Sequence, residues 1–103
     1  MNKTIDIYPH HLSIITGILE RYLPKNSTVM AFGSRTTGNA KKFSDLDIAI
    51  DSKTKLPADV MTNIKFDLED SNLPYKVDVI DWNDTSEHFK KIISADLVLL
   101  WKR

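Results

Sequence analysis

The segment from Phe32 to Asp51 constrains the fold of this chain more than any other part of it. Its sequence is FGSRTTGNAKKFSDLDIAID. A β-prone run, Thr28 to Phe32, leads into Gly33, and a second apolar run spans Leu46 to Ile50. Short apolar runs bounded by turn-forming residues are typical of strands. The sequence therefore predicts two strands joined by a loop from Ser34 to Ser44.

A helix is predicted before these strands, from Tyr8 to Tyr22, because apolar residues recur there at intervals of three and four positions. Pro9 suits its first turn, and Pro24 stops it. Gly17 inside the helix costs roughly 1 kcal/mol relative to alanine. We therefore expect Gly17 to pack closely against a neighbouring element.

The second half of the chain alternates helix and strand. A second helix is expected after Leu56-Pro57, and a third strand from Tyr75 to Ile80. Asp84, followed three residues later by Glu87, resembles a capping box at the start of a third helix. Leu97 to Trp101 forms a terminal strand or an apolar tail. This order predicts a single domain, residues 1–103, of the α+β or α/β class, with helices packed on a sheet.

The composition excludes several classes of function. The chain has 103 residues, and its 14 lysines and arginines balance 14 aspartates and glutamates. A protein without a basic surplus is not expected to bind nucleic acid stably. With no cysteine, disulfides and thiolate metal sites are impossible. Met1 to Tyr8 lacks a signal-peptide core, and no apolar run is long enough to cross a membrane, so we expect a cytoplasmic protein.

Two aspartates in the second strand are the first candidates for chemistry. Asp45 and Asp47 are two positions apart, so in a strand they share one face at a separation of roughly 6–7 Å. Their charges repel each other, and a divalent cation between them removes that repulsion. Oxygen ligands without nearby cysteine or histidine favour Mg²⁺ or Mn²⁺. The alternative is that both are ordinary surface residues.

A third aspartate stands in the third strand. Asp78 lies between Val77 and Val79 and faces the side opposite to the two valines. A half-buried carboxylate needs a partner. If this strand lies beside that of Asp45 and Asp47, the three carboxylates converge and can hold two metal ions about 3.5–4 Å apart.

The turn after the first strand suits phosphate binding. Gly33 allows close approach of the backbone, and N–H groups together with the Ser34 hydroxyl can meet phosphate oxygens. Gly38 permits the loop to return towards Asp45. Arg35 either contacts phosphate in a bidentate manner or locks the loop to a carboxylate. A Gly-Ser pair after a strand is often only a turn, but its combination with the three aspartates is specific.

These residues resemble a known signature. Gly33-Ser34-Arg35-Thr36-Thr37-Gly38 followed by Ser44-Asp45-Leu46-Asp47 is similar to the motif of the polymerase-β-like nucleotidyltransferases. From about Leu12 to Leu100 the chain resembles their minimal members in bacteria and archaea (MNT proteins), which are typically encoded beside a helical HEPN-type partner. Some of these act as antitoxins that transfer AMP from ATP to a tyrosine of the HEPN ribonuclease.

The resemblance implies a fold and a set of roles. The fold would be a mixed β-sheet of three to five strands, palm-like, with helices packed mainly on one face. Asp45 and Asp47 would bind two Mg²⁺ ions (or Mn²⁺), and Asp78 would complete the site and help to deprotonate the acceptor. Gly33 and Ser34 would hold the triphosphate. The remaining nucleotide-binding candidates in the motif are Arg35, Gly38 and Ser44.

We therefore expect a Mg²⁺-dependent enzyme that moves AMP from ATP onto a hydroxyl of a HEPN partner, within a hetero-oligomer of a toxin–antitoxin pair. Trp82, Trp101 and the apolar tail suggest a surface that a partner covers. A small-molecule acceptor is one alternative, although such enzymes usually carry a further domain. The other is an antitoxin that masks its partner without chemistry.

Overall fold

The computed structural model describes residues 4–103. The prediction that Met1 to Tyr8 contains no signal-peptide core therefore falls partly outside the described residues. A mixed four-stranded sheet forms the centre of the molecule, with strand order β3-β2-β1-β4. The strands are β1 (Thr28–Phe32), β2 (Leu46–Asp51), β3 (Val77–Asp81) and β4 (Val98–Lys102). The helices are α1 (Pro9–Tyr22), α2 (Ser34–Thr37), α3 (Ala58–Glu69) and α4 (Glu87–Ile93), with 3-10 turns η1 (Trp82–Asp84) and η2 (Ser94–Asp96).

The pairing of the strands decides which residues become neighbours. β1 is antiparallel to both β2 and β4, whereas β2 and β3 are parallel. A parallel pair needs a long crossover, which the segment containing α3 supplies. Asp47 is in register with Phe32 on one side and with Asp78 on the other. The sheet therefore sets the two aspartates side by side.

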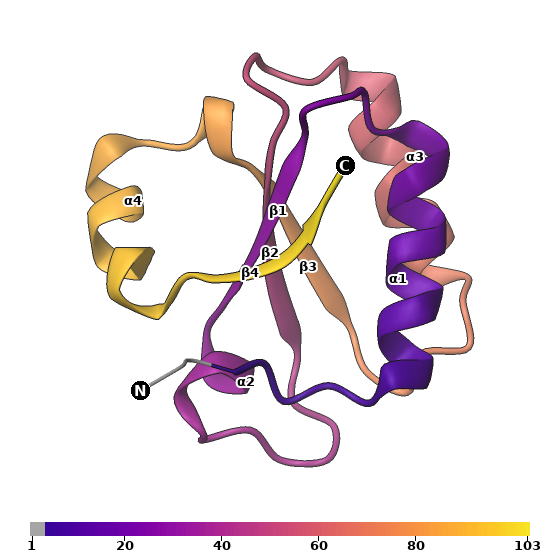
Figure 1. Ribbon diagram of the computed structural model, residues 1–103, viewed down its shortest axis with the longest axis vertical. Helices are drawn as coiled ribbons and strands as arrows, with labels where there is room; N and C mark the ends of the chain where they lie inside the picture. Colours follow the sequence, from indigo (N-terminus) through magenta and orange to yellow (C-terminus); the bar gives the residue numbers. More distant parts are fainter. Residues whose placement is uncertain (1–3) are drawn as a thin grey trace.

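The main core lies on one face of the sheet, where α1 and α3 pack side by side (Figure 1). Alternate residues of the central strands point into it, among them Val29, Ile48 and Ile50, which are fully buried. Full burial of such a side chain stabilises the fold by roughly 1.5–3 kcal/mol. The apolar side chains that recur along the helices and strands therefore pack together in one core.

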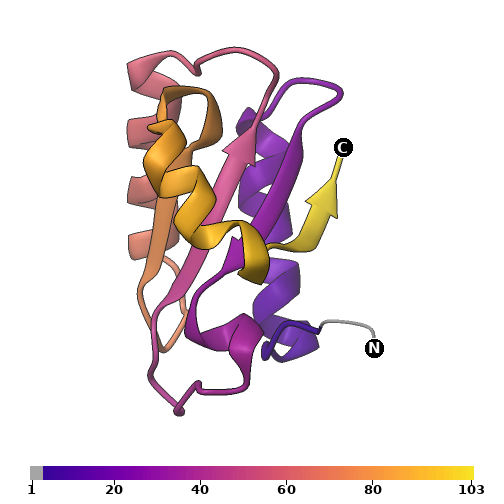
Figure 2. The ribbon, with the colours of Figure 1, turned by 90° about the vertical axis from the view of Figure 1, so that its left-hand side faces the viewer.

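The opposite face carries less cover. A smaller cluster of Phe32, Ala49 and Ile93 packs there with partly buried Trp82 and Leu97. Figure 2 shows α4 in front of the sheet and the short α2 below it. The two longest helices, α1 and α3, thus share one face, whereas the shorter α4 lies over the other. The open part of the second face is where Asp47 and Asp78 stand.

The predicted third strand and terminal strand are both present, with shifted ends. β3 begins at Val77 rather than Tyr75 and ends at Asp81, and the apolar tail forms β4, an edge strand paired with β1. Trp101 is partly buried against the main core, while Leu99 in the same strand is 54% exposed. Of the two alternatives for Leu97 to Trp101, the strand is confirmed.

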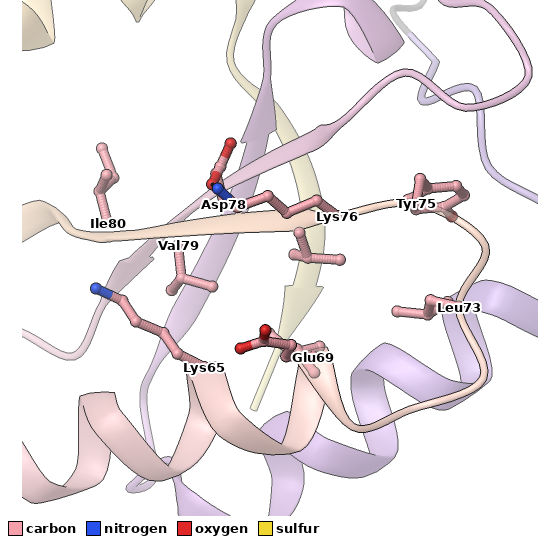
Figure 3. Close-up of a pocket in the computed structure, with 10 residues that line it drawn as sticks. Lys65, Glu69, Leu73, Tyr75, Lys76, Asp78, Val79 and Ile80 are labelled. Carbon is pink, nitrogen blue, oxygen red and sulfur yellow. Dashed lines mark ion pairs between the residues drawn. The ribbon is translucent and has the colours of Figure 1, made fainter.

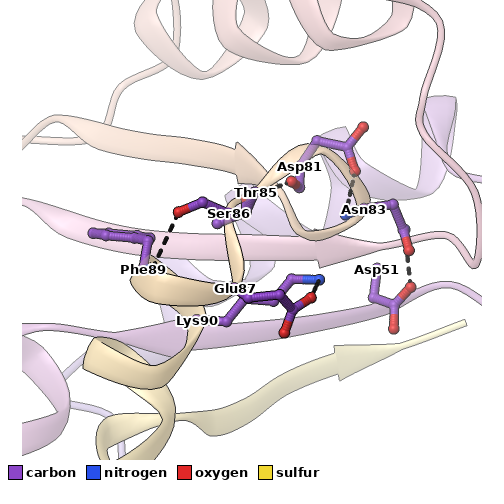
Figure 4. A network of polar contacts seen from close by, with 8 residues as sticks. All are labelled: Asp51, Asp81, Asn83, Thr85, Ser86, Glu87, Phe89 and Lys90. Atoms are coloured by element: carbon purple, nitrogen blue, oxygen red, sulfur yellow. Dashed lines mark hydrogen bonds and ion pairs between the residues drawn. The ribbon is translucent and has the colours of Figure 1, made fainter.

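The capping prediction for α4 was wrong. Ser86 is the N-cap residue, and its side chain accepts a hydrogen bond from the N–H of Phe89 at 3.2 Å (Figure 4). Asp84 instead belongs to η1, so its side chain lies too early in the chain to cap the helix. Serine and aspartate are similarly good caps, and the chain path after β3 selected the later one.

The expectation that Gly17 packs closely was also wrong. A Cβ atom added at Gly17 would meet nothing within 4 Å. Gly17 instead borders an open groove between α1 and α3, which Arg21 and Asp67 also line. The glycine therefore does not serve helix packing in this fold.

Candidate active site

Two aspartates stand next to each other on the open face of the sheet. Asp47 in β2 and Asp78 in β3 are partners in a parallel register. Their neighbours Ile48 and Val79 point into the main core, so both carboxylates point to the opposite face. The prediction that the third strand lies beside the second, with Asp78 on the face opposite to the valines, is confirmed.

The charges of this pair act on each other. Burial raises the pKa of the Asp47 carboxyl above its usual value, and the negative charges of Asp78 and Asp45 raise it further. Asp78 is relieved by Lys76, whose Nζ lies 3.2 Å from Asp78 Oδ1. Because the Lys76 side chain is 72% exposed and that of Asp78 is 42% exposed, this ion pair contributes no more than about 1 kcal/mol. Asp47 has no ion-pair partner among residues 4–103.

Asp45 occupies a different position from the one expected. It precedes β2, which begins at Leu46, and its side chain is exposed. It is nevertheless close enough to Asp47 for its charge to affect the pKa of that carboxyl. Among residues 4–103, no three histidine, aspartate or glutamate side chains already converge as metal ligands.

The backbone of Gly33 leaves space for the Asp47 carboxylate. This backbone has φ of 82° and ψ of −157°, a combination that is essentially restricted to glycine. A Cβ atom on Gly33 would be in hard contact with Oδ2 of Asp47 and 3.3 Å from its Cγ. The carboxylate therefore lies directly against the Cα atom of Gly33. Only a residue without a side chain permits this contact.

Ser34 follows Gly33 and opens the one-turn helix α2, which interrupts the loop predicted from Ser34 to Ser44. The N–H of Thr36 donates to the carbonyl of Gly33 at 3.0 Å, which closes the turn. Within the described part of the chain, the Ser34 hydroxyl has no hydrogen-bond partner and is half-buried. It remains available to a ligand beside Asp47.

Arg35 holds the loop together from inside. Arg35 is buried, with a relative exposure of 6% for the residue, and its Cζ atom lies 3.9 Å from the centre of the Tyr75 ring. Its donors reach backbone carbonyls at 2.9 Å (Nε to Ser44), 2.9 Å (Nη1 to Asp6) and 3.2 Å (Nη2 to Lys42). Of the two roles expected for Arg35, this geometry matches the locking of the loop, with carbonyls rather than a carboxylate as partners.

Gly38 and Ser44 shape the same loop. Gly38 ends α2 in the left-handed conformation, with φ of 81°, and its N–H donates to the carbonyl of Ser34. The Ser44 hydroxyl accepts a hydrogen bond from the N–H of Lys41 at 2.8 Å. The structure thus brings Gly33, Asp47 and Asp78 together with Ser34 next in the chain, leaves Asp45 exposed just before β2, and places Gly38 and Ser44 in the supporting turns.

The donor set of this site suits a hard divalent cation. All the candidate ligands are carboxylate oxygens, and Asp47 and Asp78 are lateral neighbours on one face. Burial, and then the negative charges of Asp78 and Asp45, raise the pKa of Asp47, and a bound cation would offset the cost of ionising this carboxyl. Carboxylate oxygens are the ligands preferred by Mg²⁺ and Mn²⁺. The residues present therefore fit the metal that the motif implies.

Comparison with known proteins identifies the family. Residues 14–103 match the family model described as polymerase beta, nucleotidyltransferase. The chain belongs to this nucleotidyltransferase family. Both the expected family and the expected α+β fold with a mixed sheet are confirmed.

Named relatives of this nucleotidyltransferase are known. The chain is 41% identical over 99 residues to a protein of Haemophilus influenzae (strain ATCC 51907 / DSM 11121 / KW20 / Rd) named probable protein adenylyltransferase MntA, covering 96% of this chain and 86% of that protein. A toxin–antitoxin crystal structure with AMP-PNP superposes with a TM-score of 0.74 and 24% identity, covering 89% of this chain and 73% of that one. A Shewanella oneidensis complex of a tri-AMPylated HEPN toxin with MNT antitoxin gives a TM-score of 0.69 and 21% identity, covering 91% and 71%. These solved structures share the fold of this chain.

Sequence reasoning did not identify two aromatic side chains that lie beside the candidate site. Tyr75, which the sequence assigned only to a strand, provides the ring on which the Arg35 guanidinium stacks. Phe89 of α4 places its ring edge-on to Phe32, with centroids 6.1 Å apart, and is 37% exposed beside the strand that leads to Gly33. Because these pairs are about forty or more positions apart in the chain, no local pattern links them.

A further aspartate in β3 serves structure instead. The buried Asp81 accepts hydrogen bonds from the N–H of Leu56 at 2.7 Å and the N–H of Asn83 at 3.0 Å. Asn83 also donates to Asp51 (Figure 4). Burial alone would raise the pKa of Asp51, but hydrogen bonds from the Lys53 N–H and Asn83 hold it below its usual value. These carboxylates are engaged at the far end of the sheet and do not join Asp47 and Asp78.

No helix in residues 4–103 is long and apolar enough to span a membrane.

Proposed function

We propose that this protein transfers AMP from ATP to a hydroxyl group of a HEPN-type partner protein and acts as the antitoxin of a toxin–antitoxin pair. The observation that carries the proposal is the Asp47 carboxylate, which lies against the Cα of Gly33 and beside Asp78. The name of the Haemophilus influenzae relative and the AMPylated toxin in the Shewanella oneidensis complex support AMP as the group and a HEPN protein as the acceptor.

The metal would be held by Asp45, Asp47 and Asp78. Mg²⁺, as two ions, is the expected occupant, and Mn²⁺ could replace it. When bound, it would supply positive charge that offsets the charge of the phosphates. Gly33 would let the triphosphate approach the backbone, and the free Ser34 hydroxyl would donate to a phosphate oxygen.

The reaction is a single displacement at phosphorus. The acceptor hydroxyl oxygen forms a bond to the α-phosphorus while the bond from that phosphorus to the oxygen bridging to the β-phosphate breaks. Pyrophosphate leaves, and the hydroxyl proton passes to the Asp78 carboxylate. Catalysis in such reactions comes mainly from positioning and charge.

The loop residues are assigned an indirect role. Arg35, Gly38 and Ser44 would act as positioning residues that hold Gly33 and Ser34 in place, since their polar groups are engaged within the loop. The cytoplasm, where ATP is available, remains the expected location.

Transfer of label from α-labelled ATP to the HEPN partner tests the proposal. Wild type with Mg²⁺ is expected to label the partner, whereas Asp45→Asn and Asp47→Asn should label it at least about a hundredfold more slowly while remaining folded. Asp59→Asn is the matched control, because Asp59 is an exposed aspartate in the first turn of α3.

The alternatives give different results in the same assay. Label on a small molecule and not on the partner would favour the small-molecule acceptor. A tight complex with the partner and no label from any nucleotide would favour an antitoxin that only masks its toxin. Unchanged labelling in the Asp47→Asn variant would refute the metal assignment.

A further inference from the structure

A groove runs along the outer edge of the sheet, directly beside the active-site carboxylates. It lies between β3 and α3 and has a volume of about 810 Å³. Its apolar floor is formed by Leu68, Leu73, Val77 and Val79, and Asp78 contributes to its margin. Figure 3 shows Lys65 and Glu69 extending from α3 towards β3, while Asp78 points to the other side of the strand.

The strand that borders this groove has an unpaired edge. β3 is the last strand of the sheet and pairs only with β2. The carbonyl of Lys76 accepts a hydrogen bond from the N–H of Leu46 at 2.9 Å, so the backbone of Lys76 faces β2. Peptide groups alternate in direction along a strand, which directs the N–H and C=O groups of Val77 and Val79 outwards. An edge of this kind is a template for another strand.

The same edge separates two different environments. The side chains of Val77 and Val79 point to the α3 side, where the groove is, whereas Asp78 points to the side of Asp47. Neighbouring side chains of a strand laid along β3 would also alternate between these sides. One side chain would reach the carboxylates, and the residues before and after it would enter the apolar groove.

We propose that the β3 edge binds an extended segment of the acceptor protein by strand addition. Its backbone would pair with Val77 and Val79, its hydroxyl-bearing residue would point towards Asp78, and the apolar residues on either side of that residue would fill the groove. This inference rests on the proposed transfer to a protein hydroxyl and adds how the acceptor is recognised. Main-chain pairing gives such binding its affinity, and the pockets for alternate side chains give specificity.

Charged residues of both signs line the groove: Lys65 and Lys76 are basic, and Glu69 and Asp78 are acidic. Lys76 pairs with Asp78, whereas Lys65 makes no ion pair within the described part of the chain. An acidic residue of the segment beside Lys65 would therefore gain a partner. A second copy of this chain paired through the same edge is the alternative occupant, and the experiment below distinguishes it by its dependence on protein concentration.

Binding is tested without catalysis by NMR of the ¹⁵N-labelled protein. The probe is a synthetic peptide with tyrosine between two valines and a following glutamate; the control peptide has the same residues in an order that separates tyrosine from the valines. The probe should shift the amide signals of Val77 and Val79 and slow their hydrogen exchange. The amides of Asp78 and Ile80, which face β2, should keep the protection they already have.

A substitution that covers the groove links this binding to transfer. Lys65→Trp should reduce both peptide binding and labelling of the HEPN partner by about tenfold or more, with unchanged affinity for AMP-PNP. Asn63→Trp is the matched control, since Asn63 is exposed on the same helix and does not line the groove. It should bind and label as wild type does.

Several results would overturn the proposal. The first is that the peptide shifts other amide signals and leaves those of Val77 and Val79 unchanged, or shifts none at millimolar concentration. The second is that Lys65→Trp labels the partner as fast as wild type does. The third is that the signals of Val77 and Val79 shift with protein concentration alone, which would show that a second copy binds the edge. If wild type labels no protein at all, the proposed function fails, but the NMR result still decides whether the edge binds a segment.

Discussion

Replacing Gly33 with alanine tests the central contact of the site. The backbone of Gly33, with φ of 82° and ψ of −157°, lies in a region where any side chain costs on the order of 1–3 kcal/mol. The added methyl would also be in hard contact with Oδ2 of Asp47. Asp47 would have to turn away from the position it shares with Asp78. We expect Gly33→Ala to lower the free energy of unfolding and to displace the carboxylate as well.

The chain offers a control that separates the two effects. Gly38 also has a positive φ, 81°, but a Cβ atom there meets nothing within 4 Å. Gly38→Ala should therefore cost only the left-handed backbone energy, about 1–2 kcal/mol, and leave Asp47 in place. Both variants lose stability, but only Gly33→Ala disturbs the carboxylate.

The assay combines urea unfolding with label transfer at a temperature at which both variants are folded. A loss of 1 kcal/mol lowers the melting temperature of a domain of this size by roughly 4–8 °C. A misplacement of about 1 Å at a reacting centre can cost about a hundredfold in rate. We expect that loss for Gly33→Ala and less than about tenfold for Gly38→Ala. Equal activity of the two variants at matched folding would refute the argument that Gly33 makes room for Asp47.

Three further predictions follow from the same structure. Gly17→Ala should raise the free energy of unfolding by roughly 0.5–1 kcal/mol, because alanine favours the helix and its methyl group enters open space. A lower melting temperature in thermal unfolding would show that α1 is packed against a neighbour at this position. Arg35→Lys keeps the charge, but lysine cannot donate to three carbonyls and also stack on the Tyr75 ring. We expect this variant to lower the free energy of unfolding by a few kcal/mol and to make the loop more sensitive to trypsin in limited proteolysis. The folded-state pKa of Asp47 is raised, so its contribution to stability is present below the unfolded value of 3.8 and is lost as pH rises through the folded pKa. Burial is the largest cause of this raised pKa, followed by the charges of Asp78 and Asp45. In chelator near neutral pH, Asp47→Asn should therefore have a higher free energy of unfolding than wild type, by about 1 kcal/mol. The gain should vanish below pH 3.8 and shrink once Mg²⁺ is added, so a gain that persists in acid would contradict this account.

Local sequence determined the elements and the family. Hydrophobic period and proline positions are short-range signals, which is why α1 was predicted to within one residue and the helix after Pro57 was also found. The spacing of Gly33, Ser34, Asp45 and Asp47 is likewise contained in one segment and carried the resemblance that the family comparison confirmed. The roles assigned to those residues remain predictions.

Only the tertiary structure decided what each loop residue does. The partners of Arg35 come from Asp6, from the loop at Lys42 and from Tyr75, so no pattern around Arg35 could distinguish a phosphate ligand from a loop clamp. The choice of Ser86 over Asp84 as a cap depended on the chain path after β3. Gly17 shows the same limit, since a helical glycine looks identical in sequence whether it faces a neighbour or a groove.

The groove beside Asp78 is the clearest case of what the sequence leaves open. Alternation predicted that Asp78 and the valines point to opposite faces, because side-chain direction along a strand is a local property. That β3 forms the edge of the sheet, with an unpaired backbone between the carboxylates and α3, depends on the order β3-β2-β1-β4. Strand order follows from how the helices pack across the sheet, and packing joins residues that are far apart in the chain.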